Sequence, residues 1–158
     1  LSSSRVLIIG AGGSAKAIGF GLMQAGAQVV ISNRTEETGR NLANWLGCEF
    51  TPLNDIAWVA ADVLVNTTPV GMEPDLEGIP IPTKLLPNFS AVMDIVYAPL
   101  ETRLLREAKA AGCKTINGLA MLLYQGAAQF KIWTDVRAPE LIMRAALEER
   151  LGRQGVRF

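Results

Sequence analysis

The chain has 158 residues, of which 49% are apolar and 19% charged, a composition typical of a folded domain rather than of a disordered segment. Its 15 Lys and Arg residues balance its 15 Asp and Glu residues, so no excess positive charge favours nucleic acid or an anionic membrane as a partner. The sequence contains no histidine, which excludes catalytic triads and metal sites that need an imidazole from this chain.

Its two cysteines, Cys48 and Cys113, form no CxxC pattern, so we expect no metal site and a reducing, cytoplasmic setting. No apolar run approaches the roughly 18 residues that cross a membrane. The sequence begins with Leu1 rather than Met, and the first predicted strand starts at Arg5. We therefore expect a domain that belongs to a longer protein.

β-Branched runs alternate with amphipathic segments along the chain, as in a parallel sheet covered on both faces. The predicted strands are Arg5–Ile9, Gln28–Ser32, Cys48–Phe50, Asp62–Asn66, Ala91–Ile95 and Lys114–Asn117, of which Cys48–Phe50 has the weakest pattern. The predicted helices are Ser14–Ala25, Thr35–Leu46, Leu100–Ala111, Leu119–Trp133 and Pro139–Leu151. Four prolines in Met72–Pro87 predict a surface excursion. The expected fold is α/β, a doubly wound parallel sheet forming a Rossmann-type dinucleotide-binding domain over residues 1–158 and ending in two helices.

A glycine-rich segment follows the first predicted strand and opens the first predicted helix. It reads Gly10, Ala11, Gly12, Gly13, Ser14, Ala15 and matches the G-x-G-x-x-G/A pattern. Gly10 allows a tight turn, Gly12 lets a pyrophosphate approach the backbone, and Ala15 lets the helix pack closely on the strand. Free N–H groups at the helix start would face the phosphates. The alternative is a glycine-rich turn that binds nothing, but the parallel-sheet pattern around it favours dinucleotide binding.

The end of the second predicted strand bears on the choice of cofactor. In NAD-binding domains an acidic residue about 20 positions after the glycines binds the ribose 2′-hydroxyl, whereas this chain has Asn33, Arg34 and Thr35. Arg offers a planar fork of donors to a 2′-phosphate, so we predict NADP as the cofactor. Two alternatives stay open. Thr35 could cap the next helix while Arg34 is only solvated, or Glu36 could bind an unphosphorylated ribose.

Three later motifs resemble those of the shikimate dehydrogenase family. The first is Asn66-Thr67-Thr68-Pro69-Val70-Gly71-Met72, the second runs from Asp94 through Tyr97 to Leu105, and the third runs from Asn117 and Gly118 through Met121 to Gln125. Together with the glycine turn they follow the family's order over nearly the whole chain. The resemblance implies NADPH-dependent reduction of 3-dehydroshikimate to shikimate in aromatic amino-acid biosynthesis, in a family that includes fusions to a dehydroquinate dehydratase.

The resemblance also implies roles for single residues. Asn66 and Thr67 would border the cofactor riboses, with Thr68 in the same cofactor site, and Gly118 and Met121 would lie near the nicotinamide. Tyr97 and Gln125 would bind the substrate. Each of the last three has a structural alternative: core packing for Met121, a surface amide for Gln125 and a partly buried aromatic closing the sheet for Tyr97.

The residues support one crevice independently of the resemblance. Gly10, Asn33, Asn66, Asp94 and Gly118 all lie at or just beyond the carboxyl ends of predicted strands, and ligands of open α/β sheets bind at that edge. Gly118, Met121 and Gln125 are spaced three and four apart, so they share one helix face. Asp94 is expected to organise its turn through backbone or Thr102 contacts rather than to take part in chemistry.

In the family, a lysine and an aspartate of an N-terminal substrate domain handle the proton, and no lysine of this chain stands in a matching motif. We therefore expect no catalytic residue here and no turnover by the chain alone. A second departure is Thr38, which stands where the family often carries another basic residue; Arg40 is the nearest substitute.

Three other functions are alternatives to this one. They are a non-catalytic module that senses nucleotide or metabolite, a quinate/shikimate dehydrogenase that accepts NAD, and another Rossmann oxidoreductase. The terminal helices carry more apolar residues than one sheet face absorbs, so we expect them to contact the missing substrate domain, and the isolated chain to self-associate.

Overall fold

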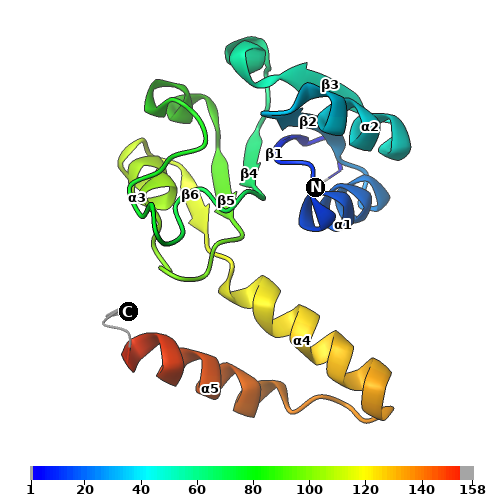
Figure 1. The fold of residues 1–158 in the computed structure, drawn as a ribbon, viewed down its shortest axis with the longest axis vertical. Helices are drawn as coiled ribbons and strands as arrows, with labels where there is room; N and C mark the ends of the chain where they lie inside the picture. Colours follow the sequence, from blue (N-terminus) through cyan, green and yellow to red (C-terminus); the bar gives the residue numbers. More distant parts are fainter. Residues whose placement is uncertain (1, 154–158) are drawn as a thin grey trace.

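The computed structural model describes residues 2–153 and contains a six-stranded parallel sheet (Figure 1). Its strands are β1 (Arg5–Ile9), β2 (Gln28–Asn33), β3 (Glu49–Pro52), β4 (Val63–Asn66), β5 (Ala91–Asp94) and β6 (Lys114–Ile116). They lie in the order β3-β2-β1-β4-β5-β6. Two runs of strands therefore wind outward from β1 in opposite directions, which confirms the predicted doubly wound fold.

The register of the central strands brings their carboxyl ends level. Ile9 at the end of β1 lies opposite Ser32 of β2 on one side and Asn66 of β4 on the other, and Asn66 lies opposite Asp94 of β5. Because all these strands are parallel, the loops that follow them start from a single edge of the sheet. This edge is where open α/β sheets bind their ligands.

Side chains of β1 alternate between two apolar layers, as a sheet covered on both faces requires. The helices are α1 (Gly13–Gln24), α2 (Glu36–Leu46), α3 (Arg103–Ala110), α4 (Leu119–Thr134) and α5 (Glu140–Arg153). Val6 and Ile8 of β1 belong to the layer under α1 and α2. Leu7 and Ile9 belong to the opposite layer, which α3 shares with two 3₁₀ segments. Helix α3 begins later than predicted because Thr102 caps it, its hydroxyl accepting a hydrogen bond from the Leu105 N–H at 3.3 Å.

The surface excursion predicted for Met72–Pro87 is only half correct. Residues 73–77 are exposed, but Ile81 and Leu86 are fully buried in the apolar layer beside α3. Here the chain forms the 3₁₀ segment Thr83–Asn88, which covers the sheet where a longer helix would otherwise lie. Prolines signal irregular backbone, not exposure, and the apolar residues between them are free to fill the core.

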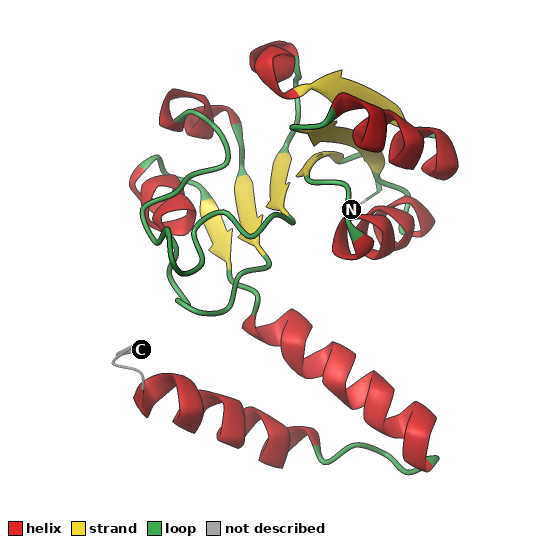
Figure 2. Ribbon diagram, viewed as in Figure 1, coloured by secondary structure: helices red, strands yellow, loops and turns green. Residues whose placement is uncertain are grey.

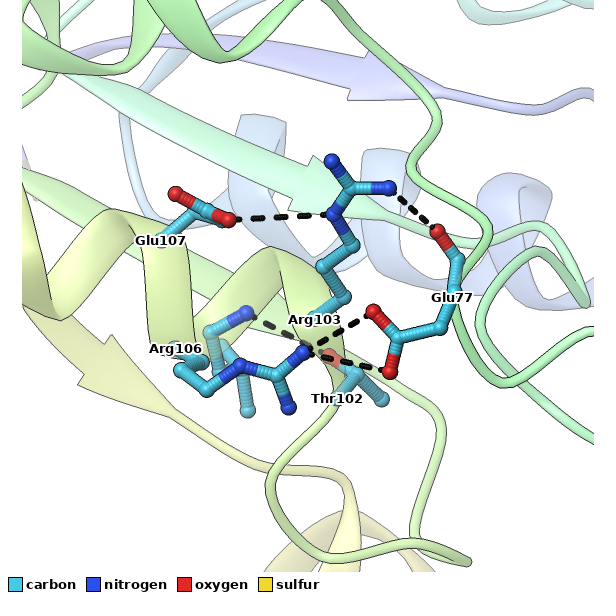
Figure 3. Close-up of polar contacts among 6 residues, drawn as sticks. Glu77, Thr102, Arg103, Arg106 and Glu107 are labelled. Atoms are coloured by element: carbon cyan, nitrogen blue, oxygen red, sulfur yellow. Dashed lines mark hydrogen bonds and ion pairs between the residues drawn. The ribbon is translucent and has the colours of Figure 1, made fainter.

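The exposed half of this excursion is tied to α3 through Glu77 (Figure 3). Arg103 Nη1 donates to the Glu77 carbonyl at 2.8 Å, and Arg106 Nη2 lies 3.1 and 3.3 Å from the two carboxylate oxygens of Glu77. The excursion is therefore held at both ends, by burial at one and by these polar contacts at the other.

Helices α4 and α5 extend away from the sheet and pair with each other in an antiparallel hairpin (Figure 2). Leu123 and Ala127 of α4 are buried, whereas Ile132, Trp133, Leu141 and Ile142 are between 71% and 84% exposed. The hairpin therefore carries a large apolar surface outside the core. Among residues 2–153, no helix combines the length and apolar character needed to cross a membrane.

Candidate functional site

A cavity of about 360 Å³ opens at the carboxyl ends of β1, β2 and β4. We call it the glycine-turn cavity. It is lined by Ile9, Gly10, Ala11, Gly12, Asn33, Arg34, Leu53, Thr67, Thr68, Pro69, Val70 and Pro80. Three segments singled out from the sequence, the glycine turn, the end of β2 and the loop after β4, therefore surround one space.

The glycine turn is shaped by its neighbours on both sides. Gly10 has a φ of +115°, and a Cβ there would collide with the Thr67 hydroxyl, so only glycine fits without strain. Its N–H donates to the Ser32 carbonyl at 2.8 Å. Thr67 donates both its N–H, at 2.8 Å, and its hydroxyl, at 2.7 Å, to the Ile9 carbonyl. The turn after β1 and the loop after β4 thus fix each other.

The start of α1 is open where a ligand would approach. No side chain within the described residues caps the helix, whose N-cap is Gly12, and Gly12 and Gly13 have free space where a Cβ would stand. Ala15 is fully buried under the helix, and Ser14 is half-buried in its first turn. The first N–H groups of a helix lack intrahelical partners and carry partial positive charge, so this end of α1 suits an anion.

The end of β2 brings a cation to the same cavity. Asn33 donates its amide to the Thr35 carbonyl at 2.9 Å, which fixes the turn into α2. Arg34 is exposed, lines the cavity, and within residues 2–153 makes no hydrogen bond or ion pair. Thr35 occupies the N-cap position, but its hydroxyl accepts nothing from the helix, so the expected cap is not formed and both groups are available to a ligand.

A buried polar network lies behind the cavity. Asp94 and Asn66 are both 0% exposed, and Asn66 Nδ2 donates to Asp94 Oδ1 at 3.0 Å. Asn66 Oδ1 accepts from the Thr68 N–H at 3.0 Å and from its hydroxyl at 2.7 Å. The Asn66 side chain therefore positions Thr68 from within the fold, which corrects the expectation that this side chain borders a ligand.

Asp94 accepts two further hydrogen bonds, from the Val96 N–H at 3.1 Å and from the Thr102 hydroxyl at 2.7 Å. These confirm that it organises the turn after β5. Burial raises the pKa of Asp94, and its hydrogen bonds offset part of that rise. The carboxylate joins the loop after β4 to the turn after β5, and both line cavities.

A second cavity, of about 270 Å³, adjoins the first and shares Thr67, Thr68 and Pro69 with it. We call it the Tyr97 cavity. Tyr97 is 42% exposed and lines it together with Met72, Ile95 and Val96. The Tyr97 side chain is therefore partly exposed and lines a cavity rather than lying wholly within the core.

Gly118 contacts the backbone of Ile95 and Val96, which line this second cavity, whereas Gln125 does not line it. Gly118 is buried, and a Cβ there would collide with the Ile95 carbonyl. Met121 is half-buried and Gln125 exposed, and neither is among the residues that line the two cavities. Because α4 rises about 1.5 Å per residue, Gln125 lies about 10 Å beyond Gly118 along a helix that leaves the sheet.

Some lining residues were not found from the sequence. Leu53 comes directly after β3, so its position beyond a strand end could have identified it, as it did the other site residues. Pro80 comes from the proline-rich excursion, and Val70 and Met72 are apolar members of the motif in which only the polar residues were predicted to bind the cofactor. Only the packing of the excursion against the sheet brings Pro80 to the cavity.

Two family models match the sequence. Residues 1–71 match the model described as "Shikimate / quinate 5-dehydrogenase", and residues 118–148 match "Shikimate 5'-dehydrogenase C-terminal domain". The chain belongs to the shikimate dehydrogenase family. It is 47% identical over 153 residues to a shikimate dehydrogenase (NADP(+)) of Halobacterium salinarum, covering 96% of this chain and 57% of that protein. It thus spans little more than half the length of its curated relatives.

Solved structures of this family share the fold. A shikimate 5-dehydrogenase from Thermus thermophilus, in complex with NADP(H) and shikimate, is 41% identical with a TM-score of 0.83, over 93% of this chain and 55% of that one. A quinate dehydrogenase from Corynebacterium glutamicum, in complex with NAD, is 30% identical with a TM-score of 0.81, over 90% of this chain and 54% of that one. The family as a whole therefore includes structures with either nicotinamide cofactor.

Proposed function

We propose that this chain is the NADP-binding domain of a cytoplasmic shikimate dehydrogenase, an oxidoreductase that reduces 3-dehydroshikimate to shikimate with NADPH in aromatic amino-acid biosynthesis. The observation that carries the proposal is Arg34, a guanidinium without a protein partner in the described chain, at the mouth of a cavity that also contains a glycine turn and an uncapped helix start. The unpaired guanidinium of Arg34 and the free N–H groups at the start of α1 together suit a ligand with two separate phosphate groups.

The residues present fit a dinucleotide. Gly10, Gly12 and the first turn of α1 would hold the pyrophosphate, and Asn33, Arg34 and Thr35 would hold the adenosine ribose with its 2′-phosphate. Ala11 and Thr67 line the same cavity. When bound, NADPH supplies the hydride, while the chain binds and orients the cofactor and excludes water from it.

The Tyr97 cavity is the proposed place of the nicotinamide and of the substrate. Its apolar walls and one phenol suit a flat ring with a polar partner beside it. Gly118 would keep α4 close to β5 here, and Met121 would pack behind the ring. Gln125 would reach the substrate only with the crevice closed, because α4 carries it away from the cavity.

The rest of the machinery is proposed to lie outside this chain. An N-terminal substrate domain would bring the lysine and aspartate that the family uses for the proton, and the shared crevice would form between the two domains. The match to little more than half of each curated relative supports this division.

Calorimetric titration of NADP and NAD into the chain tests the proposal. We expect NADP to bind more tightly, and Arg34→Ala to weaken NADP by about 10- to 100-fold, the loss of one charge-assisted phosphate contact, with little effect on NAD. Arg137→Ala, in the exposed loop between α4 and α5, is the matched control. Equal affinity for both cofactors in the wild type would favour the quinate/shikimate alternative, for which Glu36 is the motivating residue.

A further inference from the structure

We propose that Arg40 determines nucleotide specificity indirectly, by neutralising Glu36 and so preventing this carboxylate from repelling a 2′-phosphate. The proposal rests on the proposed NADP site and adds a residue that the site's own lining does not include. With Glu36 neutralised, Arg34 rather than Glu36 would determine the charge that a ligand meets at the end of β2.

Glu36 is close enough to matter. It is the first residue of α2 and follows Arg34 by two positions, so their Cα atoms are at most about 7 Å apart. Arg34 lines the glycine-turn cavity. A carboxylate at this distance from a bound phosphate dianion would weaken its binding unless another charge offsets it.

Arg40 supplies that charge and is held in place from two sides. Its Nη2 lies 3.1 Å from Glu36 Oε2, one turn further along α2, and its guanidinium carbon lies 4.6 Å from the centre of the Phe50 ring. The pair directs the Glu36 carboxylate along the helix towards Arg40. Stacking on Phe50 adds a contact that an isolated surface ion pair lacks.

Phe50 also connects this arrangement to the cavity. Gly39 packs so closely on the Phe50 ring that a Cβ there would collide with it, and the same position is 3.0 Å from the Asn33 Cβ. The ring under Arg40 thus shares a neighbour with a cavity-lining residue. Because Glu36 and Phe50 both engage its guanidinium, Arg40 acts on Glu36 rather than as a second arm on the phosphate.

The test is a set of titrations of NADP and NAD into the full chain at low salt. Removing the charge in Arg40→Gln should lower the ratio of NADP to NAD affinity about 3- to 10-fold, the effect of one uncompensated carboxylate on a nearby dianion. Glu36→Gln in the same chain should restore the ratio at least to the wild-type value, because the repelling group is gone. The Arg40→Gln effect should shrink at high salt.

Lys109→Gln is the control, since this exposed cation of α3 also pairs with a glutamate, Glu101, but lines neither cavity. An unchanged ratio in Arg40→Gln would overturn the proposal. So would a double variant as weak for NADP as Arg40→Gln, because that result would mean direct contact between Arg40 and the phosphate. Failure of the proposed function looks different: the wild type would then show no preference for NADP, and Arg34→Ala would change nothing.

Discussion

At the scale of single residues, Asp94 is unusual because its carboxylate is buried without a counter-charge among the described residues. It is fully buried and accepts hydrogen bonds from Asn66, Val96 and Thr102, yet no cation pairs with it in the described chain. An ionised carboxylate without a counter-charge is costly to bury even when it is hydrogen-bonded. Its three donors come from the two loops that line the cavities, so its hydrogen bonds serve the site's geometry.

This burial predicts a pH dependence of stability. The pKa of Asp94 is raised above its ordinary value of 3.8, chiefly by desolvation. The folded state therefore holds the proton more tightly than the unfolded chain, so the contribution of Asp94 to stability is fully present below the unfolded pKa and is lost as pH rises through the folded one. Asp94→Asn should remove this dependence, measured by urea unfolding between about pH 4 and 7.

Asn at this position can keep the bonds from Asn66 and Val96 through its oxygen, while its amide faces a Thr102 hydroxyl that can turn to accept. The exposed Asp75→Asn is the control and should retain the wild-type slope. Identical pH profiles for the wild type and Asp94→Asn would contradict this account of Asp94.

At the scale of elements, the contacts between the proline-rich excursion and α3 illustrate how a loop is positioned without a core of its own. Arg106 and Arg103 reach Glu77 from successive turns of α3 (Figure 3). Both members of the Arg106–Glu77 pair are at least half exposed, so the pair contributes only about 0–1 kcal/mol to stability. Its effect should instead be local: the pair should keep the part of the excursion between Gly71 and Gly78 ordered.

Arg106→Gln should therefore leave the free energy of unfolding within about 1 kcal/mol of the wild type but speed proteolytic cleavage within residues 73–78. Limited proteolysis followed by mass spectrometry measures the rate and position of cleavage. Lys109→Gln, which removes a longer 3.9 Å ion pair between α3 and Glu101 in the turn before it, should be cleaved like the wild type. Equal cleavage rates in all three proteins would show that the Glu77 contacts do not order the loop.

At the scale of the whole molecule, the α4–α5 hairpin is unusual because it extends away from the sheet with apolar residues exposed. Its exposed Ile132, Trp133, Leu141 and Ile142 form more apolar surface than a monomer ordinarily leaves in water. We predict that the chain alone self-associates, detected as a concentration-dependent mass in sedimentation, and that Leu141→Glu with Ile142→Lys reduces this mass. Trp58→Ser removes an equally exposed residue outside the hairpin and should change nothing. A monomer at all concentrations would contradict the prediction.

The second prediction at this scale concerns activity. Among residues 2–153, Tyr97 is the one phenol that lines the glycine-turn cavity or the Tyr97 cavity, and no lysine or carboxylate lines either of them. The chain alone should therefore not interconvert shikimate and 3-dehydroshikimate at a useful rate, since general acid–base help is typically worth about 10²- to 10⁴-fold. Adding the N-terminal domain of a family member in trans should raise the rate, followed by NADPH absorbance. Robust turnover by the chain alone at neutral pH would contradict the proposed division of labour.

Periodicity and turn residues were enough to predict the strands, their parallel order and the glycine turn, because each depends on a few neighbouring residues. Gly10 is the clearest case, since its pattern, its positive φ and its contact with Thr67 agree. Element ends were less accurate. The start of α3 depends on the Thr102 hydroxyl, a contact that the apolar pattern of the helix does not encode.

The sequence by itself determined which residues gather at the carboxyl edge of the sheet, because parallel strands in this order bring their ends together whatever their side chains. Tertiary structure decided how each is used. The Asn66 side chain points into the fold because Asp94 is a buried acceptor for it. Ile81 and Leu86 are buried because they cover an apolar face of the sheet. Gln125 lies outside both cavities because α4 leads away from the sheet. These outcomes depend on contacts between distant segments, which no local pattern specifies.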